Sequence, residues 1–223
     1  MWQALHDEFA EHGVDVVTVA LDTPASATPW LEALRPDGPV ALIDEALLTV
    51  DALGWVNVPS TVWFDERGTI VRGPEISFVK PKVHIPTTDS MPPEQREALD
   101  YVNAFPHRGD AWLDALRDWV VQGPASRFAR TPDEVVRRSR SYGIDTATAA
   151  AHHALAEHLR LHGHGDDAVA HQQHAHRLDP EQWNRKRHTW AINGGTERFA
   201  TSFVQEMRSF GPQSFYPPVD LDA

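Results

Sequence analysis

The sequence contains no cysteine. This absence excludes disulfide bonds, thiolate metal sites and cysteine nucleophiles from the 223-residue chain. The sequence also lacks any apolar run near the ~20 residues that a membrane-spanning helix needs. Residues 1–8 have neither the basic start nor the apolar stretch of a signal peptide. We therefore expect no membrane partner, and nothing encoded here directs the chain out of the cytoplasm.

The chain also has fewer basic than acidic residues. The chain has 20 lysine and arginine residues against 32 aspartate and glutamate residues, and its formal net charge is −12. Nucleic acids and anionic membranes attract basic surfaces, so we expect no nucleic-acid partner. The local basic patch of Arg137, Arg138 and Arg140 is interpreted as a solvated helix face. The apolar share of 41% is nevertheless that of a globular protein with a buried core.

The first half of the chain alternates helical and strand patterns. Trp2, Leu5 and Phe9 recur at helical spacing. The run from Val14 to Leu21 is β-branched and almost continuously apolar, which predicts a buried, parallel strand. The predicted order is a helix that ends at Gly13, a strand over 14–21, a helix over 28–34 with Thr28 as its cap and Pro29 in its first turn, a strand over 40–44 and a helix over 46–53.

The sharpest local pattern lies in residues 56–72. Two β-type runs flank the turn Asp65-Glu66-Arg67-Gly68, which has glycine where a left-handed backbone is needed, so this segment predicts a hairpin. Pro59 stands at the entrance to the first strand, where its missing N–H does least harm. Further along, helices are predicted over 93–101 and, with a strongly amphipathic pattern, over 110–120.

This order of elements resembles the redoxins, the thioredoxin-like thiol–disulfide oxidoreductases and their peroxidase relatives. The extended segment 39–44 and the motif Val58-Pro59-Ser60-Thr61 before the hairpin carry the likeness. The resemblance implies an α/β thioredoxin-like sheet domain over residues 1–123, incomplete at its N-terminus, with an insertion at about 75–108. It also implies a cis peptide bond before Pro59 and a partner-binding role for Val58, Pro59 and Ser60. The alternative is an ordinary trans proline at a strand edge.

The sequence departs from the redoxin pattern at its start. Family members place a central strand and a cysteine loop before the first helix, and this chain begins inside that helix. The resemblance therefore implies a thiol–disulfide oxidoreductase of which this chain is an inactive form, with either an upstream segment missing or a naturally degenerate copy. The competing interpretation is a noncatalytic scaffold that binds a protein or peptide partner. We predict no catalytic residue and no cofactor.

The absent strand has a structural consequence. In the family it lies between the strands that match 14–21 and 60–64, so both strands would carry unpaired edges in this chain. A different segment, a second copy in a homodimer, or direct pairing of the two strands could fill the gap. Residues 76–85 are a spare strand-like run, but Pro81 within them favours an edge position.

Beyond Pro124 the strand patterns end. Residues 131–210 predict an all-α domain, followed by an extended tail over 211–223, and Thr131-Pro132-Asp133-Glu134 predicts a helix start. Part of this region resembles one tetratricopeptide repeat, a helix–turn–helix unit, with a turn at 163–165. One such unit cannot bury its own face, so we expect it to pack on neighbouring helices. Leu155, Ala156 and Leu159 stand where the first helix of such a repeat packs. Ala168, Ala175 and Pro180 keep the spacing of the repeat in and after its second helix.

A cluster of histidines occupies positions 152, 153, 158, 162, 164, 171, 174 and 176. His158 and His162 are four residues apart and share a helix face, and His171 and His174 are similarly placed. Such pairs are compatible with zinc or nickel, but no cysteine or well-spaced carboxylate completes a ligand set. We interpret the cluster as a polar, solvent-facing surface and predict no metal site.

Overall fold

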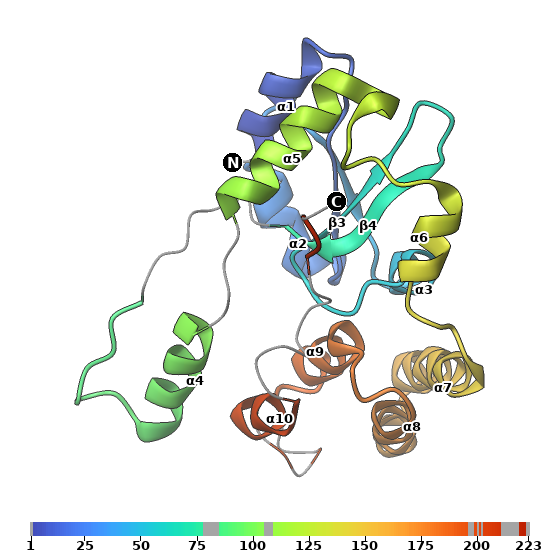
Figure 1. The fold of residues 1–223 in the computed structure, drawn as a ribbon. Coiled ribbons are helices and arrows are strands. Elements are labelled where there is room, and N and C mark those ends of the chain that lie inside the picture. Colours follow the sequence, from blue (N-terminus) through green and yellow to red (C-terminus); the bar gives the residue numbers. More distant parts are fainter. Residues whose placement is uncertain are drawn as a thin grey trace.

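The computed structural model describes residues 2–77, 85–104, 109–195, 199, 201, 203–210 and 219–221. These residues form a mixed α/β first part and a helical second part, as predicted (Figure 1). No helix among them is long and apolar enough to cross a membrane. The elements are α1 Trp2–Ala10, β1 Val17–Ala20, α2 Pro24–Leu31, β2 Val40–Ile43, α3 Leu48–Leu53, β3 Ser60–Phe64, β4 Ile70–Ile76, α4 Pro93–Ala104, α5 Gly109–Gln122, the 3-10 helix η1 Gly123–Ala125, α6 Pro132–Arg138, α7 Ile144–Leu161, α8 Gly165–Leu178, α9 Trp183–Ile192 and α10 Phe203–Phe210.

The strands form two separate two-stranded sheets. β1 pairs with β2 in parallel, with Val17 opposite Val40, and β3 pairs with β4 in an antiparallel hairpin, with Ser60 opposite Ile76. Within the described residues, β1 and β3 do not pair with each other. Of the three ways considered for filling the expected gap, direct pairing of these two strands does not occur in this part of the chain. Most of the strand-like run 76–85 lies outside the described residues.

The core of the first half lies between the hairpin and helices α1 and α5. These helices lie side by side in Figure 1, and Arg117 of α5 donates to Glu8 of α1 at 2.6 Å. Trp63 of β3 stands at the centre, with its ring 6.3 Å from that of Trp112 and 5.2 Å from that of Trp119. Further buried members of this core are Leu5, Phe9, Ala115, Leu116, Phe128 and Leu221.

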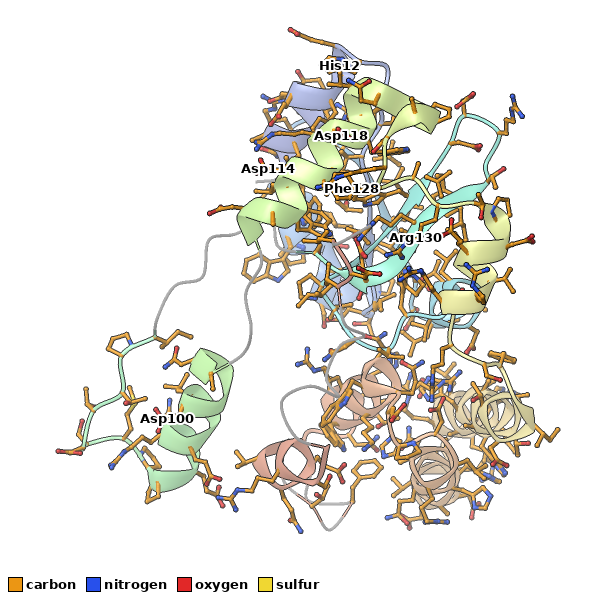
Figure 2. All side chains as sticks on the ribbon, in the orientation of Figure 1. His12, Asp100, Asp114, Asp118, Phe128 and Arg130 are labelled. Atoms are coloured by element: carbon orange, nitrogen blue, oxygen red, sulfur yellow. The ribbon has the colours of Figure 1, made fainter. Side chains whose placement is uncertain are left out.

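Arg72 of β4 forms hydrogen bonds that connect two later segments of the chain to this core. Its guanidinium is fully buried and donates to the Glu75 carboxylate at 2.7 Å and to the Phe128 carbonyl at 3.3 Å. It also donates to the carbonyl of Asp220 at 2.5 Å. The described end of the tail, residues 219–221, is therefore docked on β4. Figure 2 shows Phe128 and Arg130 in the segment that connects α5 to α6.

The second helix begins earlier than predicted. α2 starts at Pro24, and the Thr23 hydroxyl caps it by accepting from the Ser26 N–H at 3.3 Å. The prediction of a helix over 28–34 with Thr28 as cap is therefore wrong. A Thr-Pro pair occurs at 23–24 and again at 28–29, and each fits a helix start. The first pair starts the helix, and Pro29 then lies inside it.

Helices α7 and α8 form an antiparallel pair joined by a tight turn, in which Gly163 has a φ of 83°. Ala156, Ala168 and Ala175 are almost fully buried between the helices, because small side chains let two backbones approach closely. Leu155 was predicted to pack here but is 42% exposed. The inward positions of α7 are 149, 153 and 156, a helical spacing that leaves Leu155 about a third of a turn away.

Candidate polypeptide-binding site

A cavity of about 1120 Å³ separates β1 from β3. Residues 16–19 line one wall and residues 60–64 line the other. Protein interiors are close-packed, with few voids larger than a water molecule. This cavity is larger than the ~300–1,000 Å³ of ordinary ligand pockets. The apolar side chains of α1 and α5 that line it are Trp2, Leu5, Phe9, Trp112, Leu116, Trp119 and Val120.

The β1 wall presents backbone groups to the cavity. The Ala20 carbonyl accepts from the Asp44 N–H at 2.9 Å, which fixes the side of β1 that faces β2. Backbone groups of successive residues point to opposite sides of a strand. The N–H and C=O groups of Val17 and Val19 therefore point away from β2. In the described part of the chain, these groups have no sheet partner.

The β3 wall follows the same rule. The Pro59 carbonyl accepts from the Ser77 N–H at 3.2 Å, and the Asp65 N–H donates to the Thr69 carbonyl at 2.9 Å. Both bonds lie on the β4 side. The register of the hairpin shifts on both sides of Trp63, and each shift adds a residue to β4 while β3 continues regularly. Alternate residues of β3 therefore direct their N–H and C=O groups to the cavity. These residues are Ser60, Val62 and Phe64, and among the described residues the cavity side of β3 has no pairing strand.

The segment Val58-Pro59-Ser60 lies at this cavity. All three residues line it, and the peptide bond before Pro59 is cis, as predicted. Pro59 is exposed, whereas Val58 and Ser60 are half-buried. The Ser60 hydroxyl donates to the Asn57 carbonyl at 2.5 Å, which holds the turn before β3. The structure brings the three residues together, and their role in binding a partner stays a prediction.

One end of the cavity carries acidic side chains. Asp15 precedes β1, and Asp65 and Glu66 follow β3; all three line the cavity. In Figure 1 the segment that follows α1 and the turn between β3 and β4 both lie toward the upper end, and the three carboxylates belong to these two segments. Hydrogen bonds from the backbone N–H groups of Thr69 and Arg67 lower the pKa of Asp65, which keeps its carboxylate charged.

The histidines do not form a metal site in the described residues, where no group of three potential ligands is close enough to hold an ion. His152 and His171 approach to 2.8 Å between their Nδ1 atoms. The rings of His158 and His162 lie 4.1 Å apart at the end of α7 and are tilted by 33° to each other.

Two histidines of the cluster, His153 and His176, contradict the prediction that it faces solvent. His153 is buried and His176 is half-buried, and burial lowers the pKa of each to about 3. His188 of α9, which lies outside the cluster, is buried as well, and burial lowers its pKa. The spacing of the histidines did not predict that these side chains are buried, although His153 lies at an inward position of α7.

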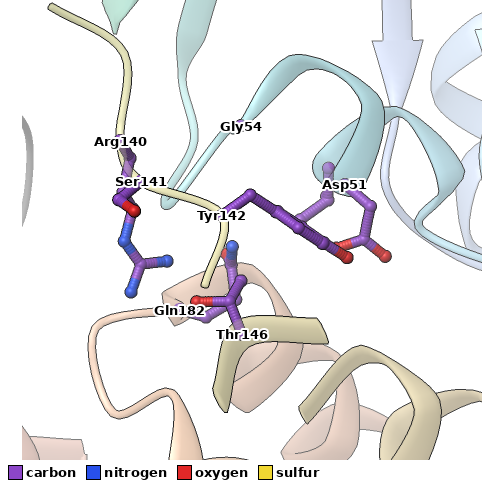
Figure 3. A pocket seen from close by; sticks show the side chains of 8 residues that line it. Asp51, Gly54, Arg140, Ser141, Tyr142, Thr146 and Gln182 are labelled. Carbon is purple, nitrogen blue, oxygen red and sulfur yellow. The ribbon is translucent and has the colours of Figure 1, made fainter. Parts of the chain in front are cut away.

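A small second pocket lies where α3 meets the helical part (Figure 3). Its volume of about 20 Å³ admits a single water molecule. Beside it, Asp179 accepts from Arg140 at 3.1 Å and from Arg185 at 3.3 Å, and Arg185 also pairs with Asp51 of α3. Arg140 was predicted to lie on a solvated face. Arg140 is exposed, but it lies beyond the end of α6 rather than on a helix face, and it pairs with the buried Asp179, which needs compensating positive charge.

The comparisons with known proteins find no match: no family model, no curated protein and no solved structure is similar to this chain.

Proposed function

We propose that this chain is a noncatalytic polypeptide-binding module, with a redoxin-type body and a tetratricopeptide-like helical region. The cavity between β1 and β3 carries the proposal, because it combines an apolar lining with two strand edges and the exposed Pro59. Polypeptides bind proteins in extended form by adding to sheet edges and placing alternate side chains in apolar pockets. A protein or peptide partner therefore fits this site better than a compact small molecule.

A second candidate is a thiol–disulfide oxidoreductase whose cysteines lie outside this sequence. The gap between β1 and β3 favours it, since redoxins have their cysteine-bearing central strand at this position. The chain itself supplies no thiolate to attack a disulfide. We therefore expect it to reduce insulin disulfides under dithiothreitol no faster than a buffer blank. A rate well above the blank contradicts the assignment of this chain as noncatalytic.

Val58→Asp tests the binding site. We expect fluorescein-labelled β-casein, an unfolded polypeptide, to bind the wild-type protein in a fluorescence anisotropy titration. The variant should bind at least about tenfold more weakly, because the partner must then bury a carboxylate at the apolar wall. Val136→Asp is the matched control: Val136 is 74% exposed on α6, so the same chemical change should leave binding unaltered. Equal affinity of both variants, or no binding by the wild type, would refute the proposed function.

A further inference from the structure

We propose that the cavity between β1 and β3 accepts one extended segment of a partner polypeptide as an inserted β-strand, which joins the two sheets into one. This inference rests on the proposed polypeptide-binding function and specifies its ligand. The ligand is a strand of about five residues, with apolar side chains at alternate positions and a basic residue at its end.

The backbone of the two walls carries the inference. Val17 and Val19 offer N–H and C=O groups from one side of the cavity, and Ser60, Val62 and Phe64 offer theirs from the other. An extended strand alternates its own groups between its two edges, so a single strand can pair with both walls. A compact apolar ligand would fill the volume but leave these groups without hydrogen bonds. An isolated two-stranded sheet is marginal in stability, whereas a continuous sheet of more strands is stable.

The lining of the cavity determines the side chains of the inserted strand. Trp2, Trp119 and Val120 lie among the residues of α1 and α5 that line the cavity, and each is only half-buried, so a ligand can contact them. Successive side chains of a strand point to opposite faces, so every second side chain of the ligand packs on these helices. Those positions must be apolar to gain burial energy there.

The acidic end of the cavity determines the charge of the ligand. Asp15, Asp65 and Glu66 line this end, and the whole chain carries a net charge of −12. Arg130 also lines the cavity, but its guanidinium donates to the Asp220 carbonyl at 3.2 Å. A lysine or arginine that flanks the inserted strand would face the three carboxylates, and opposite charge raises the rate and specificity of association. A ligand with acidic flanks is disfavoured for the same reason.

The probe that tests strand insertion is the fluorescein-labelled peptide Lys-Val-Thr-Val-Thr-Val-Lys with blocked ends. We expect it to bind the 223-residue protein and to slow amide hydrogen exchange in residues 17–19 and 60–64. The same peptide with N-methyl groups on alternate amides keeps its side chains but loses strand hydrogen bonds. It should bind at least about tenfold more weakly. A peptide with glutamate in place of both lysines should also bind more weakly.

Val62→Pro provides the matching change in the protein. It removes an N–H that faces the cavity and leaves the hydrogen bonds on the β4 side, so the hairpin can fold. We expect the variant to bind the peptide at least about tenfold more weakly, with a far-ultraviolet circular dichroism spectrum like that of the wild type. Val62→Thr keeps the N–H and should bind normally. If Val62→Pro does not fold, the N-methylated peptide still decides the question.

Other outcomes separate the two proposals. If the N-methylated and unmodified peptides bind equally, or if neither binds, strand insertion is wrong. In that case β-casein binding that depends on Val58 still supports the proposed function. If β-casein also fails to bind, the proposed function is wrong as well. Concentration-dependent dimerisation that protects 17–19 and 60–64 without peptide would assign the cavity to a second copy of this chain and overturn the partner ligand.

Discussion

Acidification should destabilise the helical part of this protein through its buried histidines. His153 on α7 is almost fully buried, and burial lowers its pKa to about 3. Within the described residues, neither of its ring nitrogens has a hydrogen-bond partner. Burial lowers the pKa of His176 on α8 to about 3 as well, and its Nε2 lies 2.9 Å from the Thr189 hydroxyl. Both side chains are therefore neutral in the folded protein at and well below neutral pH.

The size of the effect follows from the difference between folded and unfolded pKa values. Histidine in an unfolded chain has a pKa of about 6.5. Below that pH the unfolded state binds protons that the folded state excludes, so stability falls with pH. This contribution is fully present above about pH 6.5 and is lost progressively as the pH falls toward 3. Between about pH 7.5 and 5.5, each histidine lowers the free energy of unfolding by about 1.4 kcal/mol, or about 3 kcal/mol together.

Urea denaturation followed by circular dichroism at the two pH values measures this loss. His153→Phe should reduce the loss by about 1.4 kcal/mol. The variant should not lose stability at about pH 7.5, because phenylalanine fills a similar volume and removes two unpaired polar atoms. His164→Phe, at an exposed position in the turn before α8, should leave the pH dependence as it is in the wild type. If His153→Phe also leaves it unchanged, then His153 is not a buried neutral side chain.

Two further substitutions test the β3–β4 hairpin by urea denaturation. Gly73 has a φ of 118°, and an added Cβ would lie 2.8 Å from the Thr61 carbonyl oxygen. Gly73→Ala should therefore cost about 3 kcal/mol of stability, whereas Gly165→Ala, which meets open space in the first turn of α8, should not. Arg72→Ala should cost about 3–5 kcal/mol, because it leaves the buried Glu75 carboxylate unpaired. The free energy of unfolding of Arg67→Ala, at the exposed hairpin turn, should stay within about 0.5 kcal/mol of the wild-type value. If Arg67→Ala loses as much stability as Arg72→Ala, the buried Arg72–Glu75 pair is not what stabilises the hairpin.

Features set by neighbouring residues were predictable from the sequence. The spacing of Leu5 and Phe9 predicts the buried face of α1, and both residues are buried in the structure. Thr131 and Glu134 form the capping box that their spacing predicts. Gly68 takes a left-handed conformation in the hairpin turn, with a φ of 76°. Each of these features depends on interactions between residues a few positions apart, so the local sequence pattern is enough to predict it.

Where two local patterns fit the same element equally well, the sequence did not show which of them the structure uses. The Thr-Pro pairs at 23–24 and 28–29 are both valid helix starts, and the structure uses the first. The residues that face inward in a helix pair depend on the partner helix, so Leu155 was assigned to the core and His153 was not. These errors share a cause, because helix packing is decided by surfaces that come together from different parts of the chain.

By itself, the sequence determined the order of the elements, whereas the expectation of a gap between the strands at 14–21 and 60–64 came from the resemblance to the redoxins. The tertiary structure alone decided what borders that gap. Trp112 lies 6.3 Å from Trp63 although the two are far apart in sequence, and both line the cavity. Likewise, the Asp220 carbonyl accepts from Arg72 across 148 positions. Such contacts form only when the chain folds back on itself, and no local pattern of residues specifies them.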